Sequence, residues 1–215
     1  MKVSKKEMIL SVVLCLLPIV LGLVLWNELP DKVPTHFDLN NVPDGYSSKA
    51  FAVFGLPCFM AALDALLLFG LKSDPRADKH SKVLDRIMLW FIPALGLLIT
   101  PMCLFAAMGR KVNIALVIQL LIGALFIVTG NYLPKCRRNY TMGIKLPWTL
   151  NDDDNWNYTH RIGGFVWVAA GFLLLIVSFL GNPWLMFGII FAAVLIPTAA
   201  SYIYYRRYGK KENND

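Results

Sequence analysis

The chain has 215 residues, of which 57% are hydrophobic and 16% are charged, and its formal net charge is +7. Soluble domains contain about 45–50% apolar and about 25% charged residues. This composition, with a mean hydropathy of +0.55, therefore argues against an ordinary water-soluble globular protein.

The apolar residues form six blocks of 19 to 22 residues each. The blocks are residues 8–26, 50–71, 87–108, 114–133, 162–180 and 184–205. As α-helices they would be about 28–33 Å long, which matches the hydrocarbon core of a bilayer. We therefore predict an all-α integral membrane protein with six transmembrane helices in one membrane domain, residues 1–215.

The sequence also defines two helix starts. The first block follows three lysines, as a secretory signal does, but it is longer than a signal core and no A-x-A-like site follows it. We expect this helix to be retained. The fifth helix should begin near Asp152, because Asn151 and Asp152 can cap a helix and acidic residues suit its positive N-terminal end. That helix would then comprise residues 152–180.

Lysine and arginine are divided unequally between alternate connections. Seventeen lie in the two tails and in the connections after the second and fourth blocks, whereas four lie in the other three connections. Cytoplasmic loops carry an excess of these residues, so both termini are predicted to be cytoplasmic. Anionic lipid headgroups explain this basic side, and we expect membrane lipids as partners and no direct binding of nucleic acid.

The sequence carries no signature of an enzyme or a cofactor site. H-E-x-x-H, G-x-S-x-G, a Gly-rich phosphate loop and C-x-x-C are all missing. His36 and Asp38 would share one face of a strand near Asp44, but three donors without fixed geometry make a weak metal site. We expect no catalytic residue, no cofactor and no metal ion.

One charged residue, Asp64, lies inside the apolar blocks. An ionised carboxylate at this depth costs on the order of 3 kcal/mol, so it must be protonated, paired or in contact with water. A neutral carboxyl that is hydrogen-bonded between helices, with Asn131 at a comparable depth, is favoured over a proton- or ion-responsive group. The reason is that no second intramembrane charge completes a relay.

Small residues recur seven residues apart in the fifth block. They are Gly163, Gly164, Ala170 and Gly171. Such stripes allow close approach of helix backbones, so we predict helix packing here rather than a pore lining.

The outer connection, residues 27–49, is predicted to be compact. Residues 33–38 suit a short extended segment, and Pro43-Asp44-Gly45 is typical of a turn. Ordered surface loops often carry recognition, so we expect this loop to meet an extracellular peptide. Its candidate recognition residues are Pro30, Pro34, His36, Phe37, Gly45 and Lys49.

The inner connection, residues 134–161, is predicted to be cytoplasmic. Pro147 prevents a helix through its middle, and two tryptophans supply large contact areas. We predict a surface for a partner; anchoring of the tryptophans among headgroups, with Arg161 on lipid phosphate, explains the same residues equally well. The candidate surface residues are Asn139, Gly143, Pro147, Trp148, Thr149, Trp156, His160 and Arg161.

Both connections carry detailed motifs. The outer one reads L-P-x-x-[IV]-P-x-H-[FW] and then G-x-x-x-K, matched by Leu29, Pro30, Val33, Pro34, His36, Phe37, Gly45 and Lys49. The inner region reads G-N-x-[LM]-P-K, G-I-[RK]-x-P-W-T-L and W-x-x-T-H-R-x-G-G, matched by Gly130, Asn131, Leu133, Pro134, Lys135, residues 143–150, Trp156, Thr159, His160, Arg161, Gly163 and Gly164. With these motifs the chain resembles the SdpI family of bacterial membrane proteins, including its N-terminal DUF1648-like segment. Lys145 stands where arginine is common, which keeps the charge but loses the guanidinium fork.

The resemblance implies six helices in a bacterial plasma membrane, in agreement with the block count. The family's name-giving member confers immunity to a secreted peptide toxin and signals by drawing a transcriptional repressor to the membrane. The first interpretation is therefore a membrane immunity or signalling protein, with an extracellular peptide toxin and a cytoplasmic transcriptional repressor as candidate partners. The second is a small transporter or lipid-handling protein that uses Asp64 and proline-kinked helices. The sequence leaves the oligomeric state open.

Overall fold

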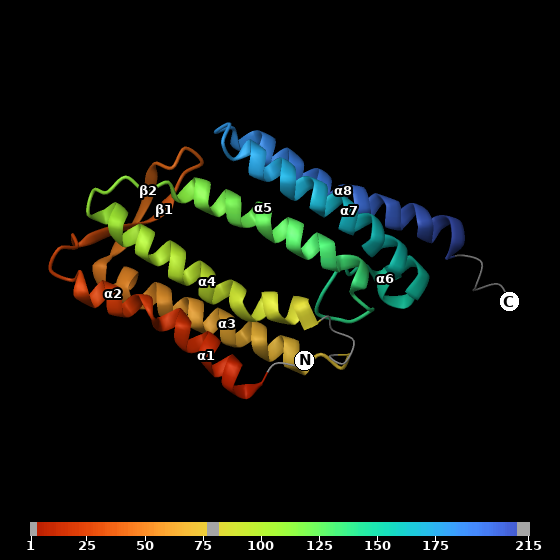
Figure 1. Cartoon of the computed structure of the whole chain (residues 1–215), viewed down its shortest axis with the longest axis horizontal. Helices are drawn as coiled ribbons and strands as arrows, with labels where there is room; N and C mark the ends of the chain where they lie inside the picture. The colour runs from red at the N-terminus through yellow and green to blue at the C-terminus, as the bar shows by residue number, and fades with distance from the viewer. Residues whose placement is uncertain (1–3, 77–81, 210–215) are drawn as a thin grey trace. The chain divides into compact units, whose positions relative to one another are not determined.

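Six helical segments in the computed structural model are long and apolar enough to cross a membrane (Figure 1). The structure describes residues 4–76 and 82–209. Within these residues the candidate spans are Lys5–Val24, Phe51–Ser73, Lys82–Ala107, Ile114–Lys135, Asp153–Val177 and Pro183–Tyr208. The chain is thus mostly helical and multi-pass, whereas the side on which each connection lies stays a prediction.

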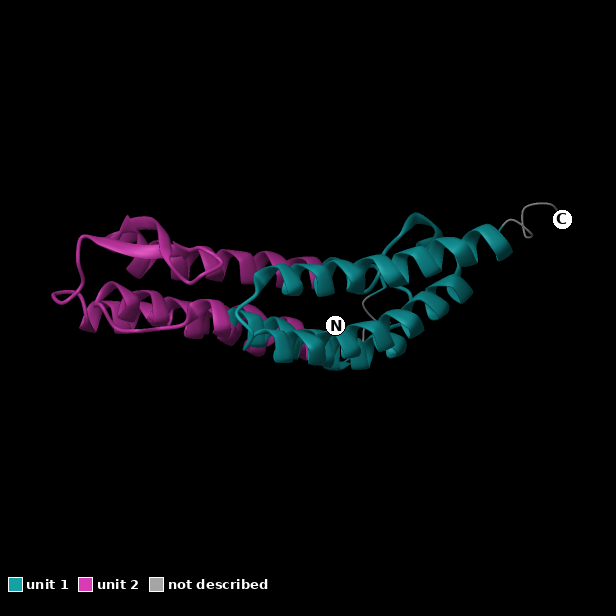
Figure 2. Cartoon of the chain, turned by 90° about the horizontal axis from the view of Figure 1, so that it is seen from above, with its two compact units in different colours: residues 1, 73–84, 118–215 teal, residues 2–72, 85–117 magenta. Residues whose placement is uncertain are grey.

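The chain divides into two compact units, which Figure 2 colours separately. Unit 1 comprises residues 1, 73–84 and 118–215, and unit 2 comprises residues 2–72 and 85–117. Helices α4 (Lys82–Ala107) and α5 (Ile114–Tyr132) have residues in both units. The single membrane domain inferred from the sequence stays a prediction.

In unit 2 the first apolar block forms two helices, α1 (Lys5–Leu16) and α2 (Pro18–Val24). Ser4 caps α1, because its hydroxyl accepts the Glu7 N–H while the Glu7 carboxylate accepts the Ser4 N–H. Pro18 starts α2 at its first position, where a missing N–H is tolerated. The helix predicted over residues 8–26 therefore begins at Lys5 and is divided at Leu17.

Residues 32–48 form an antiparallel hairpin of β1 (Lys32–Phe37) and β2 (Pro43–Ser48). In its turn, the Asp38 carboxylate accepts the N–H groups of Asn40 at 2.9 Å and Val42 at 2.7 Å, and Asn41 has a φ of 63°. The turn predicted at Pro43-Asp44-Gly45 is wrong, because Asp38 closes the chain earlier. Those three residues begin β2 instead.

A small core fixes the hairpin within unit 2. One π-helical turn, η1 (Phe51–Gly55), follows the hairpin and leads into α3 (Leu56–Ser73). Buried side chains from the hairpin stem, η1 and α4 meet in one cluster. They are Leu29, Val33, Ala52, Val53 and Leu104. The hairpin is therefore packed against helix ends rather than tethered freely.

Unit 1 contains the rest of α5, a short 3-10 turn η3 (Leu133–Lys135), α6 (Pro147–Asn151), α7 (Asp153–Val177) and α8 (Pro183–Tyr208). Asp152 caps α7, because its carboxylate accepts the N–H groups of Asp154 at 2.8 Å and Asn155 at 3.1 Å. The predicted start of this helix near Asp152 is therefore confirmed.

Helices α5 and α7 approach each other closely at glycines. A Cβ on Gly130 would lie 2.8 Å from the backbone nitrogen of Val168, and one on Gly164 would lie 2.9 Å from the Gly130 carbonyl. Two helical turns further along α7, a Cβ on Gly171 would lie 2.7 Å from the Gly123 carbonyl. Side chains at these positions would force the backbones apart. The prediction that the small residues of α7 serve helix packing is confirmed.

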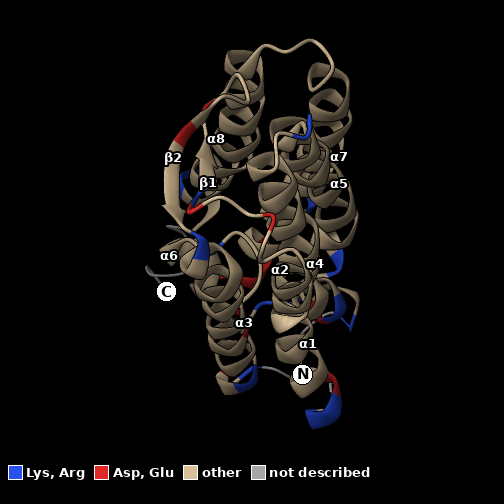
Figure 3. Cartoon of the chain, turned by 90° about the vertical axis from the view of Figure 1, so that its left-hand side faces the viewer, with Lys and Arg blue, Asp and Glu red and all other residues tan. Residues whose placement is uncertain are grey.

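Charged residues are concentrated at helix ends and in the connecting segments (Figure 3). Most of the helical ribbon is tan, which marks neither acidic nor basic residues. This distribution is the one that helices surrounded by lipid require, since a charge at membrane depth is costly.

Candidate functional site

Trp156 and His160 form the centre of a buried cluster beneath the α5–α7 connection, residues 133–152. The Trp156 indole donates to the Cys136 carbonyl at 2.7 Å, and its ring stacks on the His160 ring with centroids 4.0 Å apart. The His160 Nδ1 lies 2.7 Å from the Trp156 carbonyl, and its Nε2 accepts the Ile144 N–H at 3.0 Å. A carbonyl only accepts, so Nδ1 carries the hydrogen and the ring is neutral. Both ring nitrogens of His160 are thus used within the fold.

Asn139 shapes the beginning of the connection. Its Oδ1 accepts the N–H groups of Thr141 at 2.9 Å and Met142 at 2.7 Å, while its Nδ2 donates to the Arg137 carbonyl at 2.8 Å. This side chain is fully buried, so it substitutes for the backbone hydrogen bonds that a loop lacks. Burial also raises the pKa of the neighbouring Cys136 thiol, although a hydrogen bond from Asn139 opposes this.

Gly143 is required by its backbone conformation and by its neighbours. Its φ is +107°, a value that residues with a Cβ rarely adopt. A Cβ at this position would overlap the His160 ring and lie 3.1 Å from the Trp156 ring. The connection can therefore pass over the stacked rings only with glycine here.

The Thr149 side chain caps the N-terminal end of the short helix α6. Its hydroxyl accepts the Leu146 N–H at 2.9 Å and lies 3.0 Å from the Ile144 carbonyl. Pro147 occupies the first turn of α6, where proline is well tolerated. The sequence thus forms one helical turn in the middle of the connection, and Thr149 is buried within it.

Trp148 and Asn155 attach the connection to α8 through Ser201. The Trp148 indole donates to the Ser201 hydroxyl at 2.9 Å, and Ser201 donates to the Asn155 Oδ1 at 2.8 Å. Asn155 Nδ2 returns a hydrogen bond to the Ser201 carbonyl at 3.2 Å, and Thr159 donates to the same Oδ1 at 2.9 Å. Sequence analysis missed Asn155 and Ser201. The sequence signal that could have identified them is a polar residue on a helix: Ser201 lies within the last apolar block, and Asn155 lies in the first turn after Asp152.

Charged residues close the edge of the same cluster. Arg138 forms an ion pair with Asp153 at 2.7 Å and donates to the Leu150 carbonyl at 3.0 Å. Asp74, from the segment before α4, accepts the Thr141 hydroxyl at 2.5 Å and the Tyr140 N–H at 3.1 Å. Sequence analysis did not single out these residues, because their partners are distant in the chain.

The eight residues predicted to form a partner surface divide by burial. Four are buried and cannot touch a partner without unfolding, so that part of the prediction is corrected. They are Asn139, Thr149, Trp156 and His160. Gly143 and Trp148 are half-buried, whereas Pro147 and Arg161 are exposed. The buried four instead hold the connection in shape, because their polar groups are satisfied internally.

On the hairpin, His36 and Asp44 face each other across the strands. Nδ1 of His36 lies 2.5 Å from Oδ1 of Asp44, and both side chains are exposed. The pair lies beside Tyr46, with Leu39 and Val42 also exposed on this segment. Among the described residues no group of three His, Cys, Asp or Glu side chains is placed to hold a metal ion.

The other predicted recognition residues have different environments. Lys49 donates to the Trp26 and Leu29 carbonyls at 3.2 and 3.1 Å, so it ties the end of the hairpin to the segment that follows α2. Pro34 is buried, Pro30 is exposed, and Phe37 is half-buried. A Cβ on Gly45 would lie 2.8 Å from the Cβ of His36 on the facing strand. Pro34, Gly45 and Lys49 therefore shape the hairpin more than they enlarge its exposed face.

Asp64 is fully buried in unit 2 and bonded between helices. Its Oδ2 lies 2.5 Å from the Ser11 hydroxyl of α1, and that hydroxyl lies 2.7 Å from the Leu89 carbonyl of α4. The interhelical hydrogen bond was expected, but its partner is Ser11 rather than Asn131. Ser11 is the one hydroxyl residue in the first apolar block, which was the missed signal. Asn131 is exposed on α5 in unit 1.

Two family models match segments of the chain, one with the buried cluster and one with the hairpin. The SdpI/YfhL protein family matches residues 135–201, and a domain of unknown function, DUF1648, matches residues 13–61. The relative Immunity protein SdpI of Bacillus subtilis (strain 168) is 28% identical over 210 residues, which cover 94% of this chain and 97% of the relative. The chain is thus similar to the SdpI/YfhL family over residues 135–201 and to Immunity protein SdpI over most of its length. No solved structure matches it.

The SdpI-family segment coincides with the buried cluster. It begins beside Cys136 and ends at Ser201, so it contains the stacked rings and the Asn155–Ser201 link. The DUF1648 segment contains the hairpin, but it begins after Ser11 and ends before Asp64. The chain is a multi-pass protein of the bacterial plasma membrane, as its six apolar helices and its similarity to Immunity protein SdpI indicate.

Proposed function

We propose that the chain is a membrane immunity protein that protects a bacterial cell against a secreted peptide toxin. The observation that carries the proposal is its similarity to Immunity protein SdpI over 94% of this chain and 97% of the relative. The alignment is 210 residues long, so the likeness extends through nearly the whole chain and is not confined to one apolar helix. The role of the relative is therefore the role inferred for this chain.

In this proposal the hairpin lies outside and meets the toxin first. The scarcity of Lys and Arg in residues 27–49 supports this side. Tyr46 is 58% exposed and stands beside the His36–Asp44 pair, which offers aromatic, apolar and polar contacts to a short peptide. The packed hairpin stem lowers the ordering cost of binding, since the loop is already folded.

The α5–α7 connection would then face the cytoplasm and present a surface for signalling. Pro147 and Arg161 are its exposed members among the eight candidates, and the half-buried Trp148 lies next to Pro147. The buried cluster keeps this surface in one conformation. A transcriptional repressor is the candidate partner, and surface contact with Pro147 and Arg161 would account for it.

We infer that protection is not enzymatic and that it needs no cofactor. Both nitrogens of His160 are held in internal hydrogen bonds, so this imidazole is not free to act as a general base. Asp64 is enclosed and bonded to Ser11, which supports a structural role over a transport pathway. Binding and sequestration of the toxin is the mode that these contacts support best.

Deleting the gene in its own host tests the proposal. The deletion strain is expected to become sensitive to peptides secreted by its wild-type parent, and the intact gene should restore growth. Tyr46→Ala should restore growth poorly while reaching the membrane in normal amount. Tyr208→Ala is the matched control, because Tyr208 is similarly exposed at 50% but lies at the end of α8. Unchanged growth of the deletion strain would contradict the proposal.

A further inference from the structure

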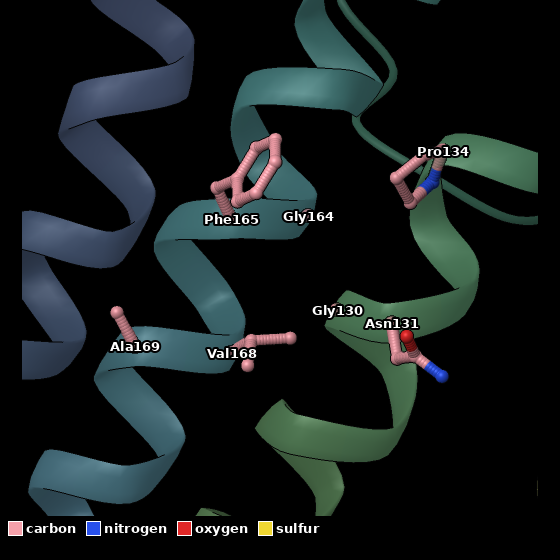
Figure 4. A pocket seen from close by; sticks show the side chains of 7 residues that line it. All are labelled: Gly130, Asn131, Pro134, Gly164, Phe165, Val168 and Ala169. Atoms are coloured by element: carbon pink, nitrogen blue, oxygen red, sulfur yellow. The ribbon is translucent and has the colours of Figure 1, made fainter.

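An open apolar groove lies between α5 and α7 in unit 1 (Figure 4). Helix α7 contributes Phe165, Val168 and Ala169, α5 contributes Asn131, and the following 3-10 turn η3 contributes Pro134. The groove has a volume of about 440 Å³. Small-molecule sites have volumes of about 300–1,000 Å³, so the groove is large enough for part of a lipid.

The floor of the groove is backbone, because glycines occupy the crossing of the two helices. Gly130 and Gly164 both line it, and a Cβ on either would lie within 2.9 Å of backbone on the facing helix, so the two backbones meet there. Phe165 is 74% exposed, so its ring stands at the edge rather than covering the floor. The result is a shallow trough between two helices, which suits a linear apolar chain better than a bulky group.

The two ends of the groove differ in polarity. Asn131 lines the groove at about the level of Val168, since a Cβ on the preceding Gly130 would lie 2.8 Å from the Val168 backbone nitrogen, and its exposed amide makes no hydrogen bond among the described residues. Arg161 lies one helical turn before Phe165 on the same face of α7, is exposed, and has no carboxylate partner in the described part of the chain. Deeper in the span, α7 contributes only Val168 and Ala169 to the groove. The occupant must therefore be apolar with one anionic or hydrogen-bond-accepting end.

We propose that this groove binds an anionic phospholipid, with one acyl chain in the trough and the phosphate at Arg161. The exposed Asn131 amide donates to a phosphate or ester oxygen of the same lipid, which satisfies a group that would otherwise lack a partner near hydrocarbon. A membrane-spanning helix of a second copy or of a peptide is apolar along its length, so it would leave this polar end unmatched. Charge complementarity therefore favours the phospholipid.

Filling the trough tests the acyl-chain part of the proposal. Ala169 is exposed, so Ala169→Phe should occupy the groove without displacing buried side chains. Ala192→Phe is the matched control, because Ala192 is an exposed alanine on α8 and does not line the groove. Native mass spectrometry of the full chain, titrated with phosphatidylglycerol in detergent, should show one retained lipid in the wild type and in the control. Ala169→Phe should lose it.

Removing the charge tests the headgroup part. Arg161→Gln should weaken binding of phosphatidylglycerol about fivefold and leave phosphatidylethanolamine binding unchanged, as expected for one basic residue near an anionic group. Arg206→Gln, at an exposed arginine on α8, should change neither lipid.

Three results would overturn the proposal. They are equal lipid retention in Ala169→Phe and wild type, equal affinity of the wild type for both lipids, and a dimer that Ala169→Phe abolishes while lipid binding persists. The last result would assign the groove to a second copy. If Ala169→Phe does not fold, as judged by gel filtration, Ala169→Leu replaces it with the same expected loss.

Discussion

Asp64 is expected to be a neutral carboxylic acid that joins three helices. The Ser11 hydroxyl lies 2.5 Å from Asp64 Oδ2 and 2.7 Å from the Leu89 carbonyl. A hydroxyl has one hydrogen and a carbonyl only accepts, so Ser11 donates to Leu89 and the carboxylic acid of Asp64 donates to Ser11. Oδ1 of Asp64 has no partner among the described residues, which costs a buried carboxylate more than a neutral acid.

Two substitutions separate this account from a buried charge. Asp64→Asn keeps a donor for Ser11, so the free energy of unfolding should change by less than about 1 kcal/mol. Asp64→Ala leaves Ser11 without its donor and should destabilise by about 1–3 kcal/mol. Unfolding is measured by titrating the detergent-solubilised protein with sodium dodecyl sulfate, with the exposed hairpin substitution Asp44→Asn as the control.

Infrared spectroscopy reads the protonation state directly. The spectrum of the wild type minus that of Asp64→Asn at pH 7 should contain the carbonyl stretching band of a protonated carboxylic acid. A carboxylate band in its place would refute the hydrogen-bond argument. Normal folding of Asp64→Asn with loss of toxin protection would refute the structural role that we assign to Asp64.

Three further predictions concern sidedness, the buried cluster and its thiol. In a cysteine-free background, Asn40→Cys should react with an impermeant maleimide added outside intact cells and Asn151→Cys should not; equal labelling would contradict cytoplasmic termini. Gly143→Ala should destabilise the protein by about 1–3 kcal/mol in the same detergent titration, because φ is +107° and the new Cβ would meet the His160 ring. An unchanged free energy of unfolding would disprove the need for glycine at this position. Burial raises the pKa of Cys136, so its reactive thiolate should form only at higher pH than in the unfolded chain. Alkylation of Cys136 at pH 8 should therefore be slow until the protein is denatured. Rapid alkylation of the native protein would argue against the cluster.

Much of the fold follows from local sequence signals. Apolar length alone identifies the spans, since few soluble proteins contain six such blocks. Asp152 marks the start of α7 because its carboxylate caps the first turn regardless of tertiary contacts. The sequence analysis predicted the hairpin turn at the wrong residues, because two segments with turn-forming residues, 38–42 and 43–45, follow each other directly in the chain. Pro43-Asp44-Gly45 has the usual composition, but Asp38 accepts two backbone N–H groups and Asn41 adopts the positive φ.

The site was harder to predict than the fold, for a physical reason. The motif around Trp156 and His160 shows that these residues matter, but their burial depends on where the connection passes. That path is set by Asn139 and by the link from Asn155 to Ser201, which lie 46 residues apart in sequence. Composition and spacing do not report such pairings, so an aromatic pair that is stacked inside the fold was interpreted as a surface.

Transfer of immunity to a sensitive strain tests the central claim most directly. The chain is expressed in a bacterium that lacks an SdpI-type immunity protein, at a membrane abundance matched to that of a control membrane protein. The lethal concentration of the peptide toxin that the chain's own host secretes is then compared between the two strains. The account predicts that the strain with this chain survives toxin concentrations that kill the control. Equal killing of both strains, with the chain folded in the membrane, would contradict the account.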